Sequence, residues 1–118
     1  MNKTGSLGER IAVKHLKKCG YKIIETNFKL KCGEIDIIGK DNNYICFIEV
    51  KTQTSNEFKQ PFEEVDYFKQ EKLRLTAEIW LTMRNLCDSA CRFDIVSVIL
   101  SDNPHSHNIK VIKDAFWV

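Results

Sequence analysis

One stretch of the chain decides the fold: it reads Gly-Glu-Ile-Asp-Ile-Ile-Gly (33–39), Lys-Asp-Asn-Asn (40–43) and Tyr-Ile-Cys-Phe-Ile-Glu-Val-Lys (44–51). The first and third segments are rich in β-branched and aromatic residues, and the four residues between them are a good turn sequence. The stretch therefore predicts a β-hairpin. Its second strand is apolar on both faces until it reaches Glu49, which is typical of a central strand covered on both sides.

The segments on either side of this hairpin complete an α/β pattern. Apolar periodicity and turn residues predict a helix over 5–19, a strand over 21–30, a helix from Pro61 to about residue 83, a strand over 93–100, a loop over 101–106 and a strand over 109–112. The second helix carries its apolar stripe on Val65, Phe68, Leu73, Ala77, Trp80 and Leu81. We expect one domain over 1–118 with a single mixed β-sheet flanked by helices, in the order α-β-β-β-α-β-β.

Composition narrows the class of protein. The chain has 118 residues, 43% of them hydrophobic and 29% charged, as expected for one globular domain. It contains no apolar run long enough to span a membrane, and the first ten residues lack the apolar core of a signal peptide. We therefore expect a cytoplasmic protein without a membrane partner. The five cysteines are irregularly spaced, which favours reduced thiols over a disulfide framework or a zinc site.

The net charge is only +2, much less than the surplus of a protein that coats nucleic acid. Lysines nevertheless crowd the first third of the chain, at positions 14, 17, 18, 22, 29, 31 and 40. A basic face and an ordinary solvated surface both account for this pattern.

The hairpin brings acidic residues together. If its turn is centred between Asp41 and Asn42, Asp36 lies opposite Phe47 and shares a face with Glu49 and Lys51, while Glu34 lies opposite Glu49. Asp36 is then a diagonal neighbour of Glu49, at about 7–8 Å between backbones. A register slip of one residue would move Asp36 to the other face.

Carboxylates gathered at the end of an apolar strand pair are costly unless a cation compensates them. Oxygen ligands without nearby His or Cys favour Mg²⁺ or Mn²⁺, and Lys51 would orient or deprotonate an attacking water or neutralise charge on a phosphate. The alternative is a surface ion pair of Glu49 with Lys51 beside a solvated Asp36. Glu9 lies on the apolar side of the first predicted helix, an unusual place for a carboxylate that serves no site.

The residues that carry a family resemblance run along most of the chain. They are Gly8-Glu9, Gly20-Tyr21, Asn27, Gly33-Glu34-Ile35-Asp36-Ile37-Ile38, Phe47-Ile48-Glu49-Val50-Lys51, Lys69, Ala77, Arg92-Phe93-Asp94-Ile95-Val96 and Ala115-Phe116. This pattern resembles the bacterial YraN-type family of uncharacterised proteins. That family looks like a member of the PD-(D/E)xK nuclease superfamily, with a restriction-endonuclease-like fold, and is similar to archaeal Holliday-junction resolvases.

The resemblance implies a magnesium-dependent phosphodiesterase with Asp36, Glu49 and Glu9 at the metal and Lys51 as the catalytic lysine. Lys69 and Gln53 are the candidate nucleic-acid contacts, although Lys69 is equally well explained as a helix lysine whose amine reaches solvent. Gln53 stands where the family often has Arg, Lys59 where it has Gly, and Val111 and Asp114 where it has His and Asn.

The residues and the resemblance together predict a metal-dependent endonuclease that hydrolyses phosphodiester bonds in branched, single-stranded or duplex DNA, and the similarity to resolvases places junction DNA among the candidate substrates. Similarity to resolvases also implies a homodimer, because those enzymes make paired cuts. Two alternatives stay open: a catalytically silent nucleic-acid-binding or accessory module with the same fold, and a purely structural interaction domain.

Overall fold

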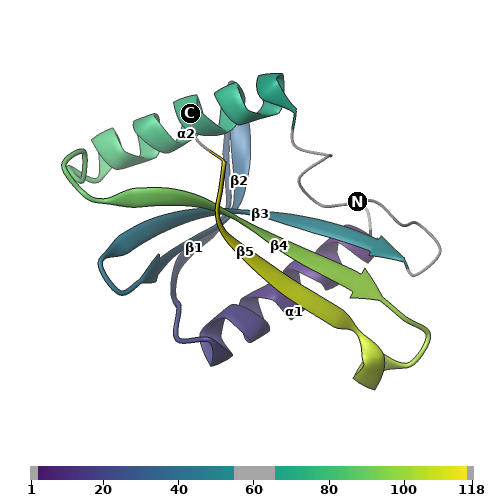
Figure 1. The fold of residues 1–118 in the computed structure, drawn as a ribbon. Helices are drawn as coiled ribbons and strands as arrows, with labels where there is room; N and C mark the ends of the chain where they lie inside the picture. Colours follow the sequence, from purple (N-terminus) through teal and green to yellow (C-terminus); the bar gives the residue numbers. More distant parts are fainter. Residues whose placement is uncertain (1–2, 55–65, 117–118) are drawn as a thin grey trace.

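The computed structural model describes residues 3–54 and 66–116, and their fold is one five-stranded sheet between two helices (Figure 1). The strands are β1 (Lys22–Leu30), β2 (Gly33–Asp41), β3 (Tyr44–Thr54), β4 (Cys91–Leu100) and β5 (Asn108–Phe116), and they lie side by side in that order. Strand β3 pairs with β4 in parallel, and the other neighbours pair antiparallel. The predicted α/β class, the mixed sheet and the order α-β-β-β-α-β-β are confirmed.

Helix α1 (Lys3–Lys18) covers one face of the sheet. Its buried residues Ala12 and Leu16 pack against a cluster that includes Ile48 of β3 and Val96 of β4. The helix ends where the sequence predicts, because Gly20 adopts a left-handed φ of 95° that reverses the chain.

Helix α2 (Tyr67–Met83) covers the opposite face through Leu73, Ala77 and Trp80. A helix continuous from Pro61 is wrong, because Asp66 is extended, at φ −76° and ψ 174°, and its carboxylate accepts a hydrogen bond from Lys69 N as the N-cap. Residues 61–65, including Val65, lie outside the described residues. Phe68 is also wrongly placed in the apolar stripe, since it is 76% exposed.

The hairpin forms, but with a different register from the expected one. Its turn is Asn42-Asn43, with Asn42 at φ 54°, and the cross-strand pairs run from Asp41–Tyr44 to Ile37–Ile48. The turn is therefore centred one residue later than predicted, because Asp41 continues the strand. Continuing this register past Ile37–Ile48 places Asp36, in place of Glu34, across from Glu49.

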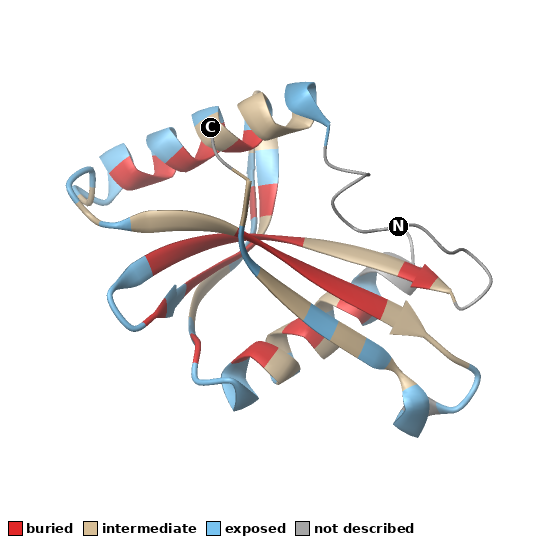
Figure 2. Cartoon of the chain, in the orientation of Figure 1, coloured by how far each residue is buried: buried red, intermediate tan, exposed pale blue. Residues whose placement is uncertain are grey.

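The core lies on both faces of the two central strands (Figure 2). Residues 45–49 of β3 and 94–98 of β4 are buried without interruption, which confirms β3 as a covered central strand.

Strand β4 begins two residues earlier than predicted, and β5 extends from Asn108 to Phe116 in place of 109–112. The predicted loop over 101–106 contains a short 3₁₀ helix, η2 (Pro104–Ser106).

All five cysteines are free thiols. None of the helices in the described part of the chain has the length and apolarity to span a bilayer.

Candidate functional site

Glu49 is the centre of the candidate site. It is the sixth of the eleven residues of β3, which continues past the predicted end at Lys51 to Thr54, and it is only 6% exposed. Its Oε1 is 2.7 Å from Nζ of Lys69, which α2 supplies, and 3.5 Å from Nζ of Lys51 on the same strand. The alternative of a solvated surface pair between Glu49 and Lys51 is wrong, because both side chains are largely buried, at 7% and 15% exposure.

Asp36 joins this group where β2 and β3 separate. Its Oδ2 accepts a hydrogen bond of 2.8 Å from the backbone N–H of Val50, just beyond the last pair of the β2–β3 ladder. Ile35 packs on the α2 side of the sheet and Ile37 on the α1 side, although residues two apart in a strand ordinarily share a face. Asp36 therefore lies at a local twist of β2, within reach of groups from both faces.

The environment of Asp36 opposes its negative charge. Burial raises the pKa of Asp36 well above its usual range, and the carboxylates of Glu49, Glu9 and Glu34 raise it further, against the lowering effect of the Val50 N–H. Glu34 acts only from a distance, because its side chain is 61% exposed and lies beside Lys29. A proton or a cation would relieve this repulsion.

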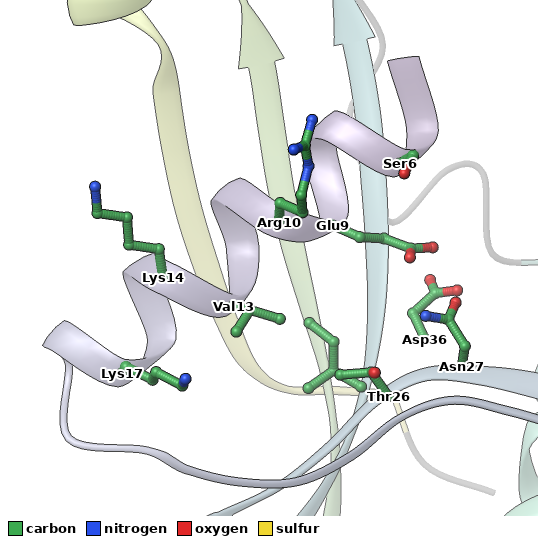
Figure 3. Close-up of a pocket in the computed structure, with 10 residues that line it drawn as sticks. Ser6, Glu9, Arg10, Val13, Lys14, Lys17, Thr26, Asn27 and Asp36 are labelled. Atoms are coloured by element: carbon green, nitrogen blue, oxygen red, sulfur yellow. The ribbon is translucent and has the colours of Figure 1, made fainter. Parts of the chain in front are cut away.

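Glu9 reaches the site from α1 across a pocket. Figure 3 shows its carboxylate extending from the helix toward Asp36, and both residues line the same pocket. The neighbouring Gly8 permits this approach, because a Cβ there would overlap Oγ1 of Thr52 on β3. Glu9 is on the apolar side of its helix because that side faces the pocket that contains Asp36.

The two candidate nucleic-acid contacts differ in exposure. The Lys69 side chain is 39% exposed, and its amine lies 2.7 Å from Oε1 of Glu49. Burial lowers the pKa of Lys69, but the Glu49 carboxylate more than compensates and raises it overall. Gln53 is 7% exposed, which limits any contact with nucleic acid to a small part of its surface.

The donor chemistry of the site fits Mg²⁺ or Mn²⁺. Asp36, Glu49 and Glu9 are hard oxygen donors, and magnesium commonly uses one or two carboxylates and keeps its remaining waters. Within residues 3–54 and 66–116, however, no three His, Cys, Asp or Glu side chains are grouped as a ready-made metal site. The ammonium of Lys69 lies 2.7 Å from Oε1 of Glu49, so a metal that binds through this oxygen would have to replace it.

Asn27 is a site residue to which the sequence assigned no role. It is exposed, lines the pocket with Glu9 and Asp36, and lies across from Asp36 because the flanking residues pair as Thr26–Ile37 and Phe28–Ile35. Asn is depleted in strands, so an Asn inside the predicted strand 21–30 was the available signal.

A second polar network lies at the opposite end of the central strands. Asp94, fully buried, accepts hydrogen bonds from Arg92 Nε and Tyr21 Oη, and Arg92 also binds Asp41, which Lys113 contacts at 2.9 Å. These charges compensate one another. The network links Tyr21, which lies between α1 and β1, to strands β2, β4 and β5. We interpret it as structural.

These features define an α/β domain with a largely buried acid–lysine site on β3. A family model described as Uncharacterised protein family UPF0102 matches residues 8–98. A UPF0102 protein of Clostridium botulinum strain Hall is 44% identical over 115 residues, covering 97% of this chain and 94% of the relative. One of Clostridium kluyveri is 45% identical over 114 residues, covering 97% and 93%. The chain belongs to this family, in agreement with the resemblance to a bacterial family of uncharacterised proteins.

Proposed function

We propose that this protein is a metal-dependent endonuclease that hydrolyses phosphodiester bonds in DNA, with branched or junction DNA as the preferred substrate. The observation that carries the proposal is the pair of largely buried carboxylates, Asp36 and Glu49, held beside the ammonium of Lys51. Such a group is costly to fold unless it binds a cation, and this cost is typical of functional sites. The similarity to PD-(D/E)xK nucleases noted from the sequence points in the same direction.

Each residue has a distinct part in this proposal. Asp36 and Glu49 would hold Mg²⁺ or Mn²⁺, and Glu9 would support the ion from across the pocket. The ion, when bound, supplies Lewis-acid activation of water and phosphate. Lys51 lies 3.5 Å from Glu49 and contributes a positive charge that neutralises the phosphate oxygens as charge builds on them. The backbone N–H of Val50 orients Asp36.

One observation favours a catalytically silent nucleic-acid-binding module as the second candidate. Glu49 is already paired with two lysines, Lys69 and Lys51, so its negative charge is compensated without a metal. In that case the site would be a structural ion network, and nucleic acid would bind with salt dependence but without cleavage.

A substrate panel separates these candidates. Four-way junction, flap, single-stranded and duplex DNA are incubated with Mg²⁺ or Mn²⁺ and either the parent protein, Glu49→Ala, Lys51→Ala or the control Lys110→Ala, which alters an exposed lysine of β5. We expect cleavage by the parent and the control, and a loss of about 100-fold or more in the two site variants. Intact DNA in every parent reaction, or equal cleavage by Glu49→Ala, would refute the nuclease.

A further inference from the structure

The pocket between α1 and strands β1 and β2 is also lined by residues outside the candidate metal site. It has a volume of about 430 Å³, and its two ends differ in charge. Glu9 and Asp36 lie at one end, and the rest of the lining combines basic side chains of α1 with neutral and apolar residues, which are Ser6, Val13, Thr26, Asn27 and Ile37. A pocket with this distribution of charge can bind a chain of phosphates whose first member lies beside the carboxylates.

Three basic residues of α1 border this pocket: Arg10, Lys14 and Lys17 (Figure 3). Their spacing of four and three residues places them on one side of the helix, and all three are exposed. At 1.5 Å per residue, the row extends over about 10 Å along the helix axis. One isolated phosphate does not need three cations over that length, whereas a polynucleotide backbone does.

Asn27 marks the acidic end of the pocket. It has a φ of 54°, a left-handed conformation that non-glycine residues adopt infrequently and that tends to persist at functional sites. Figure 3 shows its amide beside the Asp36 carboxylate and facing Glu9. A neutral amide can donate a hydrogen bond to a phosphate oxygen at a place where the two carboxylates would repel that phosphate.

We propose that this pocket is the groove that binds the nucleic-acid backbone, with Arg10, Lys14 and Lys17 neutralising successive phosphates and Asn27 donating to the phosphate nearest Asp36. This inference deepens the proposed function and rests on it for the identity of the substrate. The ligand chemistry is a phosphodiester chain, which both DNA and RNA supply.

Charge variants test the basic row. Lys14→Gln/Lys17→Gln is compared with Lys72→Gln/Lys110→Gln, which removes two exposed lysines outside the pocket. Binding of fluorescein-labelled single strands of DNA and of RNA with the same sequence is followed by anisotropy, with Ca²⁺ in place of Mg²⁺ and increasing salt. Two lost phosphate contacts should reduce the slope of log K against log salt by about 1.4 and weaken binding roughly 25-fold at 0.1 M salt for the pocket pair alone.

A second pair of variants tests Asn27. Asn27→Gly keeps a residue suited to φ 54° and removes the amide, whereas Asn27→Asp keeps the size and adds a charge. We expect Asn27→Gly to melt no lower than the parent, to bind Mn²⁺ as the parent does, and to bind the labelled strands about tenfold more weakly. Asn27→Asp should bind them more weakly still, because it repels phosphate.

The outcomes separate this groove from the nuclease. If the pocket pair and the control pair lose equal affinity for both strands, or if Asn27→Gly binds like the parent, the groove assignment is wrong even where the parent cleaves DNA. If binding depends on Lys14, Lys17 and Asn27 but no substrate is cut, the groove stands and the nuclease fails. A parent that binds neither strand overturns both.

Discussion

Replacing Lys69 by Met should strengthen metal binding, because it removes the cation that Glu49 holds in the absence of metal. Lys69 Nζ lies 2.7 Å from Oε1 of Glu49, and a metal that binds through this oxygen must displace the ammonium. A contact that stabilises only the metal-free arrangement weakens metal binding by its own free energy. Met keeps the length of the aliphatic stem and removes the charge.

The size of the effect follows from the geometry. Two unit charges at this separation attract by about 6 kcal/mol at an effective dielectric constant near 20. The Lys69 side chain is 39% exposed, so solvent screens the interaction, and Lys51 still faces Glu49 after the substitution. We therefore discount the net contribution of the pair to about 1–2 kcal/mol, which corresponds to roughly tenfold tighter Mn²⁺ binding.

Isothermal titration calorimetry of Mn²⁺ at neutral pH measures this change directly. Lys72→Met is the matched control, since it removes an exposed lysine three residues along the same helix. Glu49→Gln should abolish the binding in both backgrounds. Equal or weaker Mn²⁺ affinity in Lys69→Met than in the parent would show that Lys69 does not compete with a metal at Glu49.

The remaining predictions concern stability. Gly8→Ala should lower the free energy of unfolding in urea by about 1–3 kcal/mol, because its Cβ overlaps Thr52, and a Thr52→Gly background should recover part of the loss; full stability in the single variant would contradict this close approach. Hydrogen bonds from Arg92 and Lys113 hold the pKa of Asp41 below its usual range, so Asp41 stabilises the fold above about pH 4 and loses this contribution as the pH falls further. Asp41→Asn should accordingly flatten the acid side of a urea stability profile, and an unchanged profile would exclude this role.

The hairpin shows which structural features a local sequence pattern can predict. β-Branched residues, a polar turn and a uniformly apolar second strand were enough to predict β2, β3 and the central position of β3, since these features depend on neighbours in sequence. The register was wrong, because the sequence Lys-Asp-Asn-Asn (40–43) allows more than one turn centre. In the structure Asp41 pairs with Tyr44 as the last residue of β2, and its carboxylate contacts Arg92 of β4 and Lys113 of β5, which local sequence cannot show.

The helices show the same division. The end of α1 before Gly20 could be predicted from the sequence, because a left-handed residue after a helix is a local requirement. Helix α2 does not continue from Pro61, since Asp66 is its N-cap and accepts a hydrogen bond from Lys69 N, although this signal is equally local. Phe68 is exposed because, at about 100° per residue, it lies on the opposite side of α2 from the buried Ala77.

Local pattern was sufficient to predict the α/β class, the order of the elements and the candidates Asp36, Glu49 and Lys51, because periodicity depends on neighbours in sequence. The family resemblance added Glu9. Tertiary structure alone decided which groups meet. The separation of β2 from β3 turns Asp36 toward Glu9 and Asn27, and α2 brings Lys69 to Glu49. Such contacts between distant segments depend on twist and helix docking, which no local pattern specifies.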